Sequence, residues 1–166
     1  MPFPRQRGLR FAESILGRPS DIGDSPSLSG AQHGVGVYYY GYNTPGTVTG
    51  TVSGNMVFSY QKGGIVVNGA NATVQVTGNT VAGLGPVDFI AQNGIQFGWG
   101  ANGSAAGNDI SGNFYTGTVG IGPTPGGQNP PGWQYVSAGL LLYVPGTVWH
   151  ANNHYAGNQR NVAMYP

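Results

Sequence analysis

The sequence predicts an all-β protein in which short strands stack as the coils of a β-solenoid. Three observations support this prediction: the chain repeats itself, its residue types favour strand over helix, and Gly and Asn separate the repeated units. The segment 63–112 holds nearly the same pattern twice, because Gly64-Ile65-Val66-Val67 returns as Gly94-Ile95-Gln96-Phe97. Self-similarity with a period of about 20–50 residues indicates units that stack on one another.

The composition is that of a folded domain with low charge. The chain has 166 residues, enough for one domain with a buried core, and 7% of them are charged. Globular proteins usually carry about 25% charged residues, but the hydrophobic fraction of 39% is too high for a disordered tract. Val, Thr, Ile and Tyr recur with the alternation of strands, so we expect one short helix at most, within Arg7–Leu16.

Charge and cysteine content exclude several classes of partner. The formal net charge of +1 predicts no steering toward nucleic acid, and no apolar run approaches the length of a membrane span. The chain has no cysteine, which excludes disulfides and thiolate ligands. His33, His150 and His154 do not combine with carboxylates at metal-ligand spacing, so we expect neither a metal nor another cofactor.

Residues 1–33 differ from the rest of the chain, since they contain four of its six basic residues and three of its five acidic ones. A solenoid needs its open end covered, which favours an N-terminal cap here; the alternative is a disordered leader. The segment lacks the run of about seven apolar residues that a signal peptide needs. The compartment therefore stays unknown.

Residues 34–166 carry the repeats. A glycine or asparagine followed by alternating hydrophobic residues recurs at Gly36, Gly64, Gly94, Gly139 and Asn161, which predicts about five coils. Successive side chains of a strand point to opposite faces, so alternate residues of these elements should face a shared core. The predicted inward columns are Val37, Ile65, Ile95, Leu140 and Val162, and Tyr39, Val67, Phe97, Leu142 and Met164.

Two further strands in each coil supply the rest of the core. Their predicted inward residues are Val52, Val76 and Ala105 in one strand, and Val57, Val81, Ile110 and Tyr155 in the next. His150 falls in register with Val76, which favours a core or end-capping histidine over a ligand.

A Gly-Asn corner separates these two strands. The asparagines Asn55, Asn79, Asn108 and Asn153 follow one another in steps of 24, 29 and 45 residues. The longest step contains one insertion, Gly117–Trp133, whose Pro and Gly content marks a loop. Asparagine tolerates the left-handed backbone of a tight corner, and asparagines stacked about 4.8 Å apart can form a hydrogen-bonded ladder.

These repeats resemble the right-handed parallel β-helix superfamily, the single-stranded solenoid of pectate-lyase-like and polygalacturonase-like proteins. The likeness covers residues 34–166 and rests on TVSGNMV, VTGNTVAG, AAGNDISGN and the Gly-Ile elements. The resemblance implies a right-handed coil and favours an extracellular or cell-surface location. It carries over no catalytic residue, because those enzymes use clustered aspartates or acidic calcium ligands that this chain lacks.

Length variation concentrates where the third strand of a coil leads to the next Gly-hydrophobic strand. We call this region the loop corner (58–63, 82–93, 114–138 and 156–161). In repeat proteins such a region is often the binding face. Aromatic rings among amides suit a sugar, so the predicted ligand-binding residues are Tyr60, Gln92, Tyr115, Trp133 and Tyr135. The alternative is that these loops pack their own aromatic side chains inward.

The outward face of the Gly-hydrophobic strands is unusually apolar. Its columns are Tyr38, Val66, Gln96, Leu141 and Ala163, and Tyr40, Asn68, Gly98, Tyr143 and Tyr165. An exposed apolar patch usually marks a contact. We therefore expect the Tyr38/Leu141 face to be covered by the N-terminal segment or to self-associate, with a carbohydrate platform as the alternative.

Only weak catalytic candidates are present. Lys62, Asp88 and Arg160 lie at the loop corner, and Asp109 and His154 occupy equivalent outward positions on successive coils. A carboxylate can orient an imidazole for proton transfer, but no third group completes a triad. An ordinary surface pair explains Asp109 and His154 equally well.

The sequence thus favours a binding module over an enzyme. We expect a β-helix that binds a polysaccharide or surface glycan, or packs against a partner, without a recognisable catalytic centre. One alternative is a polysaccharide lyase or glycoside hydrolase with the loop corner as its cleft. The other is a structural spike or adhesin segment.

Overall fold

The computed structural model describes residues 34–43, 45–117 and 135–166, where all regular structure is strand. The predicted cap or leader at 1–33, the short helix within it and nearly all of the insertion at 117–133 lie outside these residues. The strands are β1 (Val35–Tyr40), β2 (Val48–Ser53), β3 (Met56–Phe58), β4 (Gly63–Asn68), β5 (Ala72–Thr77), β6 (Thr80–Val87), β7 (Asn93–Gly98), β8 (Asn102–Ala106), β9 (Asp109–Tyr115), β10 (Ala138–Tyr143), β11 (Val148–Ala151), β12 (His154–Ala156) and β13 (Arg160–Tyr165).

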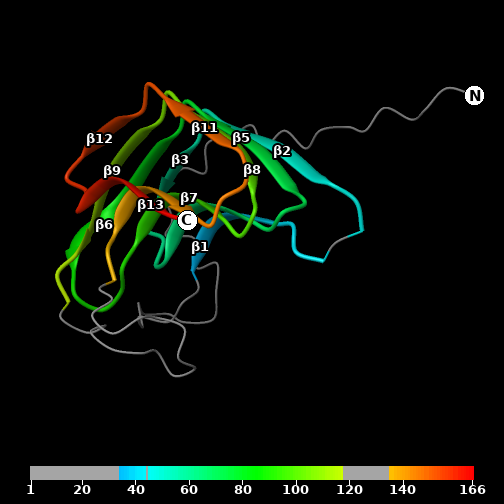
Figure 1. The fold of residues 1–166 in the computed structure, drawn as a ribbon. Coiled ribbons are helices and arrows are strands. Elements are labelled where there is room, and N and C mark those ends of the chain that lie inside the picture. The colour runs from blue at the N-terminus through cyan, green and yellow to red at the C-terminus, as the bar shows by residue number, and fades with distance from the viewer. Residues whose placement is uncertain (1–33, 44, 118–134) are drawn as a thin grey trace, which may run out of the picture.

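The strands form three sheets, which the chain visits in a fixed order (Figure 1). The first sheet has the order β1-β4-β7-β10-β13, the second β2-β5-β8-β11 and the third β3-β6-β9-β12. Each strand pairs in parallel with the strand three places later in the chain. The prediction of an all-β protein with stacked parallel strands is thereby confirmed.

The core lies between the three sheets and follows the predicted inward columns. Val37, Ile65, Ile95, Leu140 and Val162 are register partners along the first sheet. Side chains in the middle of each column have no exposed surface, and the hydrophobic cluster joins all three sheets. Burial of this apolar area is the main stabilising term for such a stack.

Close packing explains why glycine is the second residue of the repeated strands β4 and β7. A Cβ added to Gly64 would lie 2.5 Å from Cγ1 of Val81 on the third sheet and 2.6 Å from the carbonyl oxygen of Gly94. Gly94 meets Ile110 at 2.5 Å in the same way one coil later. The repeated glycine therefore lets the first sheet approach the inward side chains of the third.

The predicted asparagine ladder is present at the corner between the second and third sheets. The backbone N–H and Nδ2 of Asn55 donate to Oδ1 of Asn79 at 3.0 and 3.1 Å, and Asn79 repeats this pattern with Asn108. Asn108 continues it to Asn153. The left-handed residue of the corner precedes each ladder asparagine, with φ of 68°, 63°, 63° and 53° at Gly54, Gly78, Gly107 and Asn152.

Three predictions need correction. Met164 and His150 keep the predicted inward register, as partners of Leu142 and Ala105, but the expected burial of both in the core was wrong. Both side chains are exposed because β13 and β11 pair on one side only within the described residues. The end-capping alternative for His150 stays a prediction. The long loop expected from Ala82 is strand as far as Val87, since β6 pairs with β9 up to Val87↔Tyr115, with an irregularity between Ala82 and Gly85.

Candidate functional site

Two predicted ligand-binding residues hold the loop corner together from inside. Gln92 is fully buried: its Nε2 donates to the carbonyls of Tyr60 and Gln61 at 2.7 and 3.1 Å, and its Oε1 accepts from Leu84 N–H at 2.9 Å. The Tyr60 hydroxyl donates to Oδ1 of Asn113 at 2.6 Å. Burial raises the pKa of Tyr60, and the hydrogen bond to Asn113 offsets part of that rise. The polar groups of both side chains therefore form hydrogen bonds with other parts of the protein.

Lys62 lies half-buried beside this cluster. Its Nζ donates to the carbonyl of Ala91 at 2.8 Å, and the loss of solvent lowers the pKa of Lys62 to about 8. Asp88 and Arg160 are exposed, and no ion pair within residues 34–43, 45–117 and 135–166 joins either of them to Lys62. The structure does not link these three catalytic candidates by direct charge contact.

The other predicted binding residues of the loop corner divide into three cases. Tyr115 is buried, and its ring occupies the space beside Gly117. Tyr135 is exposed at the edge of the described segment, and Trp133 lies outside the described residues. Tyr135 is therefore the described member of the set that presents a ring to solvent.

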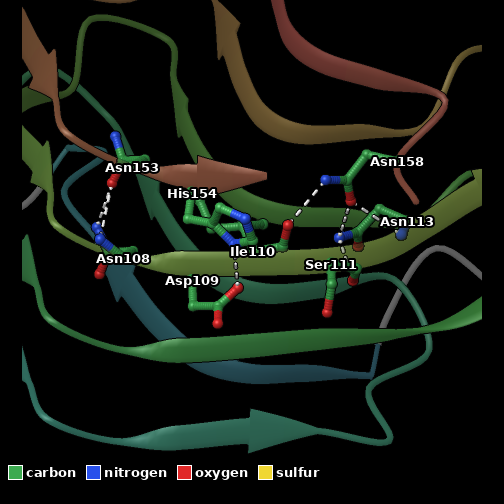
Figure 2. A network of polar contacts seen from close by, with 8 residues as sticks. All are labelled: Asn108, Asp109, Ile110, Ser111, Asn113, Asn153, His154 and Asn158. Carbon is green, nitrogen blue, oxygen red and sulfur yellow. Dashed lines mark hydrogen bonds and ion pairs between the residues drawn. The ribbon is translucent and has the colours of Figure 1, made fainter. Parts of the chain in front are cut away.

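Asp109 and His154 meet as the register predicts (Figure 2). Nδ1 of His154 lies 3.1 Å from Oδ1 of Asp109, and the two side chains are 74% and 58% exposed. Asparagine pairs flank them on both sides: Asn108–Asn153, and Asn113–Asn158 with Nδ2 to Oδ1 at 3.0 Å. So much exposure means that water screens the pair, and we assign it no catalytic role.

A row of amides crosses the outward face of the first sheet. Nδ2 of Asn93 donates to Oε1 of Gln96 at 3.4 Å, and Nε2 of Gln96 donates to Oδ1 of Asn68 at 3.0 Å. Nδ2 of Asn68 lies 3.5 Å from the hydroxyl of Tyr38. These amides and Val66 are buried, so the middle of the Tyr38/Leu141 face is less exposed than the sequence predicts.

Aromatic rings form a continuous strip beside this row, across the first sheet. Five successive contacts join them, with ring centroids 5.9, 5.0, 6.0, 5.2 and 6.1 Å apart. These separations are those of favourable tilted and edge-to-face pairs. Three of the rings are about half exposed, at 52%, 52% and 45% for Tyr38, Tyr40 and Trp99. We call this surface the aromatic strip: Tyr38, Tyr40, Tyr42, Trp99, Tyr143 and Tyr165.

Two of the coils that the strip crosses have no aromatic residue at the register position of Tyr40 and Tyr143. Tyr40, Asn68, Gly98 and Tyr143 are register partners, so the β4 and β7 coils leave a gap there. Tyr42 and Trp99, which follow β1 and β7, contact each other and close that gap.

Trp99 reaches this place through a left-handed backbone. Its φ is 51°, while Gly69 and Val144, at the equivalent corner of neighbouring coils, have φ of 102° and 45°. A bulky residue in this region is strained, and such strain recurs at functional sites.

Sequence reasoning placed Tyr38, Tyr40, Tyr143 and Tyr165 on one face but missed Tyr42 and Trp99. Both lie in corners, where the period-two alternation of a strand no longer fixes side-chain direction. The available signal was an aromatic residue directly after the repeated strand, as in Gly98-Trp99.

Neither a metal-ligand group nor a membrane-spanning helix is found in the described part of the chain. It contains no group of three or more His, Cys, Asp or Glu that could hold a metal ion. None of its elements is a helix long and apolar enough to cross a membrane. Comparison with protein-family models, curated proteins and solved structures found no match to this chain.

Proposed function

We propose that this chain is a right-handed parallel β-helix of about five coils that binds a neutral polysaccharide along the aromatic strip. The observation that carries the proposal is the unbroken row of six rings across the first sheet, three of them about half exposed. A contiguous exposed apolar surface of this kind usually marks a binding site.

Sugar rings fit such a surface chemically. The C–H faces of a pyranose stack on aromatic faces, while tyrosine hydroxyls and the indole N–H can bond sugar hydroxyls. None of the six side chains carries a formal charge. Burial, together with neighbouring Tyr38 and Tyr40, raises the pKa of Tyr42 to about 12, so its hydroxyl stays protonated in ordinary buffers. A neutral glycan suits this strip better than a polyuronide.

The scaffold supports binding through rigidity. The strip is built on paired parallel strands, and each of its rings contacts a neighbour. A surface that is already ordered loses little conformational entropy when a ligand binds. The strained backbone of Trp99 fits the same interpretation, because it fixes an exposed ring where the coil would favour glycine.

A glycan array followed by calorimetry tests the proposal. We expect binding to neutral polysaccharides and a loss of affinity of about tenfold or more in Trp99→Ala and in Tyr143→Ala. Trp149→Ala is the matched control, since Trp149 is 60% exposed but belongs to β11 of the second sheet. Equal losses in Trp99→Ala and Trp149→Ala, or no glycan bound at all, would refute the proposal.

The two alternatives predict different results. A polysaccharide lyase or hydrolase would cleave pectin, alginate or related polymers, and Lys62→Met would abolish that activity. A spike or adhesin segment would bury the aromatic strip against a second copy of the chain, and Trp99→Ala would then lower the measured mass in solution.

A further inference from the structure

The asparagine ladder has a direction. At every step the backbone N–H and Nδ2 of one asparagine donate to Oδ1 of the asparagine in the next coil, from Asn55 through Asn79 and Asn108 to Asn153. All six distances lie between 2.9 and 3.1 Å. A shorter ladder runs the same way from Asn113 to Asn158. Each backbone N–H of the ladder therefore faces the C-terminal end of the stack and each Oδ1 faces the N-terminal end. From Asn79 onward, Nδ2 also donates to a carbonyl of the preceding coil.

The two ends of this ladder are complementary. Among the described residues, none donates to Oδ1 of Asn55, and none accepts from the backbone N–H of Asn153. The first coil thus ends in an acceptor and the last in a donor. A coil stacked on β13, β11 and β12 with an asparagine at the ladder position would extend the pattern by one step of about 4.8 Å.

The last coil also presents core-type side chains at its end. Met164 stands in the inward column of the first sheet and is 61% exposed, and His150 stands in the inward column of the second and is exposed. Tyr155 and Val162 are only partly buried. β13, β11 and β12 each pair on one side within the described residues, and such open edges are templates for further strands.

We propose that the last coil binds the first coil of a second copy of this chain, head to tail, with Asn153 donating to Asn55 of the partner molecule. Parallel strands then continue across the junction in all three sheets. A tail-to-tail dimer would place donor against donor at the ladder, which leaves polar groups without partners. The head-to-tail contact is heterologous and does not close on itself, so it generates open-ended assemblies.

Two blocking variants test this arrangement. Met164→Lys places a charge at the tail, where Met164 is exposed on the outermost strand. Thr51→Pro removes an N–H from the edge of β2 that has no partner strand within the described residues. Val48 N–H donates toward β5, so the alternate residues Thr49 and Thr51 direct theirs away from it. Asn55→Leu is a second head variant: it removes the ladder acceptor Oδ1 together with Nδ2, which donates to Asn79 and Ser53. Thr80→Lys, exposed in the middle of the third sheet, is the control.

Light scattering and sedimentation of the 166-residue chain give the result. We expect the mass of the wild-type chain and of Thr80→Lys to rise with concentration without a fixed end point. Each blocked variant alone should be a folded monomer by circular dichroism, and an equimolar mixture of a head variant with Met164→Lys should form a dimer that grows no further.

Three outcomes would overturn the proposal. One is a wild-type chain that stays monomeric at every accessible concentration. Another is a folded Met164→Lys that assembles like the wild type, and the third is a mixture of blocked variants that forms no dimer while the wild type assembles. Assembly lost in Trp99→Ala but kept in Met164→Lys would assign the contact to the aromatic strip instead.

Discussion

Replacing Asn108 by alanine tests how much the asparagine ladder stabilises the stack. Asn108 is almost fully buried and makes four side-chain hydrogen bonds. Its Oδ1 accepts from the backbone N–H and Nδ2 of Asn79, and its Nδ2 donates to the carbonyl of Val76 and to Oδ1 of Asn153. The change would leave the N–H of Asn79 buried without an acceptor.

The expected loss follows from these contacts. A buried donor without a partner costs about 1–3 kcal/mol, and each further hydrogen bond contributes about 0.5–1.5 kcal/mol. The terms are not additive, so we expect Asn108→Ala to lower the free energy of unfolding by about 3 kcal/mol. Asn55→Ala, at the half-exposed end of the ladder, should cost less than about 1 kcal/mol, since it orphans no backbone donor.

Urea unfolding measures these differences in the free energy of unfolding directly when its dependence on urea concentration has the same slope in each variant. Asn108→Asp is the sharper companion variant, because it keeps the acceptor for Asn79 but sets a carboxylate oxygen against the carbonyl of Val76. It should be at least as damaging as alanine at neutral pH. An Asn108→Ala loss no larger than that of Asn55→Ala would refute the structural role of the ladder.

Further predictions concern three other sites. Trp99→Gly should be more stable than Trp99→Ala by about 1 kcal/mol in urea unfolding, because glycine adopts a φ of 51° without strain; equal stabilities would contradict this. The pKa of Lys62 is lowered to about 8 from 10.5, so the unfolded chain binds the proton more tightly and stability should rise as pH increases between those values. Lys62→Met should flatten that rise, and an unchanged pH profile would argue against the burial of the amine. Asp109→Asn should leave the unfolding midpoint and glycan affinity unchanged, because water screens its contact with His154.

Much of the scaffold could be predicted because one physical rule recurs along the chain. Alternation along paired strands fixes which side chains face the core, and it placed Ile65, Ile95 and Leu140 in one column. Alternation also gave the inward register of Met164 and His150, but it could not give their exposure, since it fixes the direction of a side chain and not whether another coil lies over it. An inward position is buried only where another coil lies over it.

The site was harder to predict because part of it is formed in corners between strands. Tyr60 and Gln92 were expected to face a ligand, and instead they are buried in contacts that join segments about 30 residues or more apart. Trp99 and Tyr42 were missed although they complete the aromatic strip. Side-chain direction in corners depends on backbone dihedrals such as the φ of Trp99, which a repeat pattern does not encode.

The most direct test of glycan binding is the affinity of neutral oligosaccharides of increasing length, measured by calorimetry. The five strands of the first sheet place the ends of the aromatic strip roughly 19 Å apart, from four steps of about 4.8 Å. We predict that affinity rises with chain length until the oligosaccharide spans this distance and then levels off, and that Trp99→Ala removes the rise. Affinity independent of length, or a rise that persists in Trp99→Ala, would contradict binding along the strip.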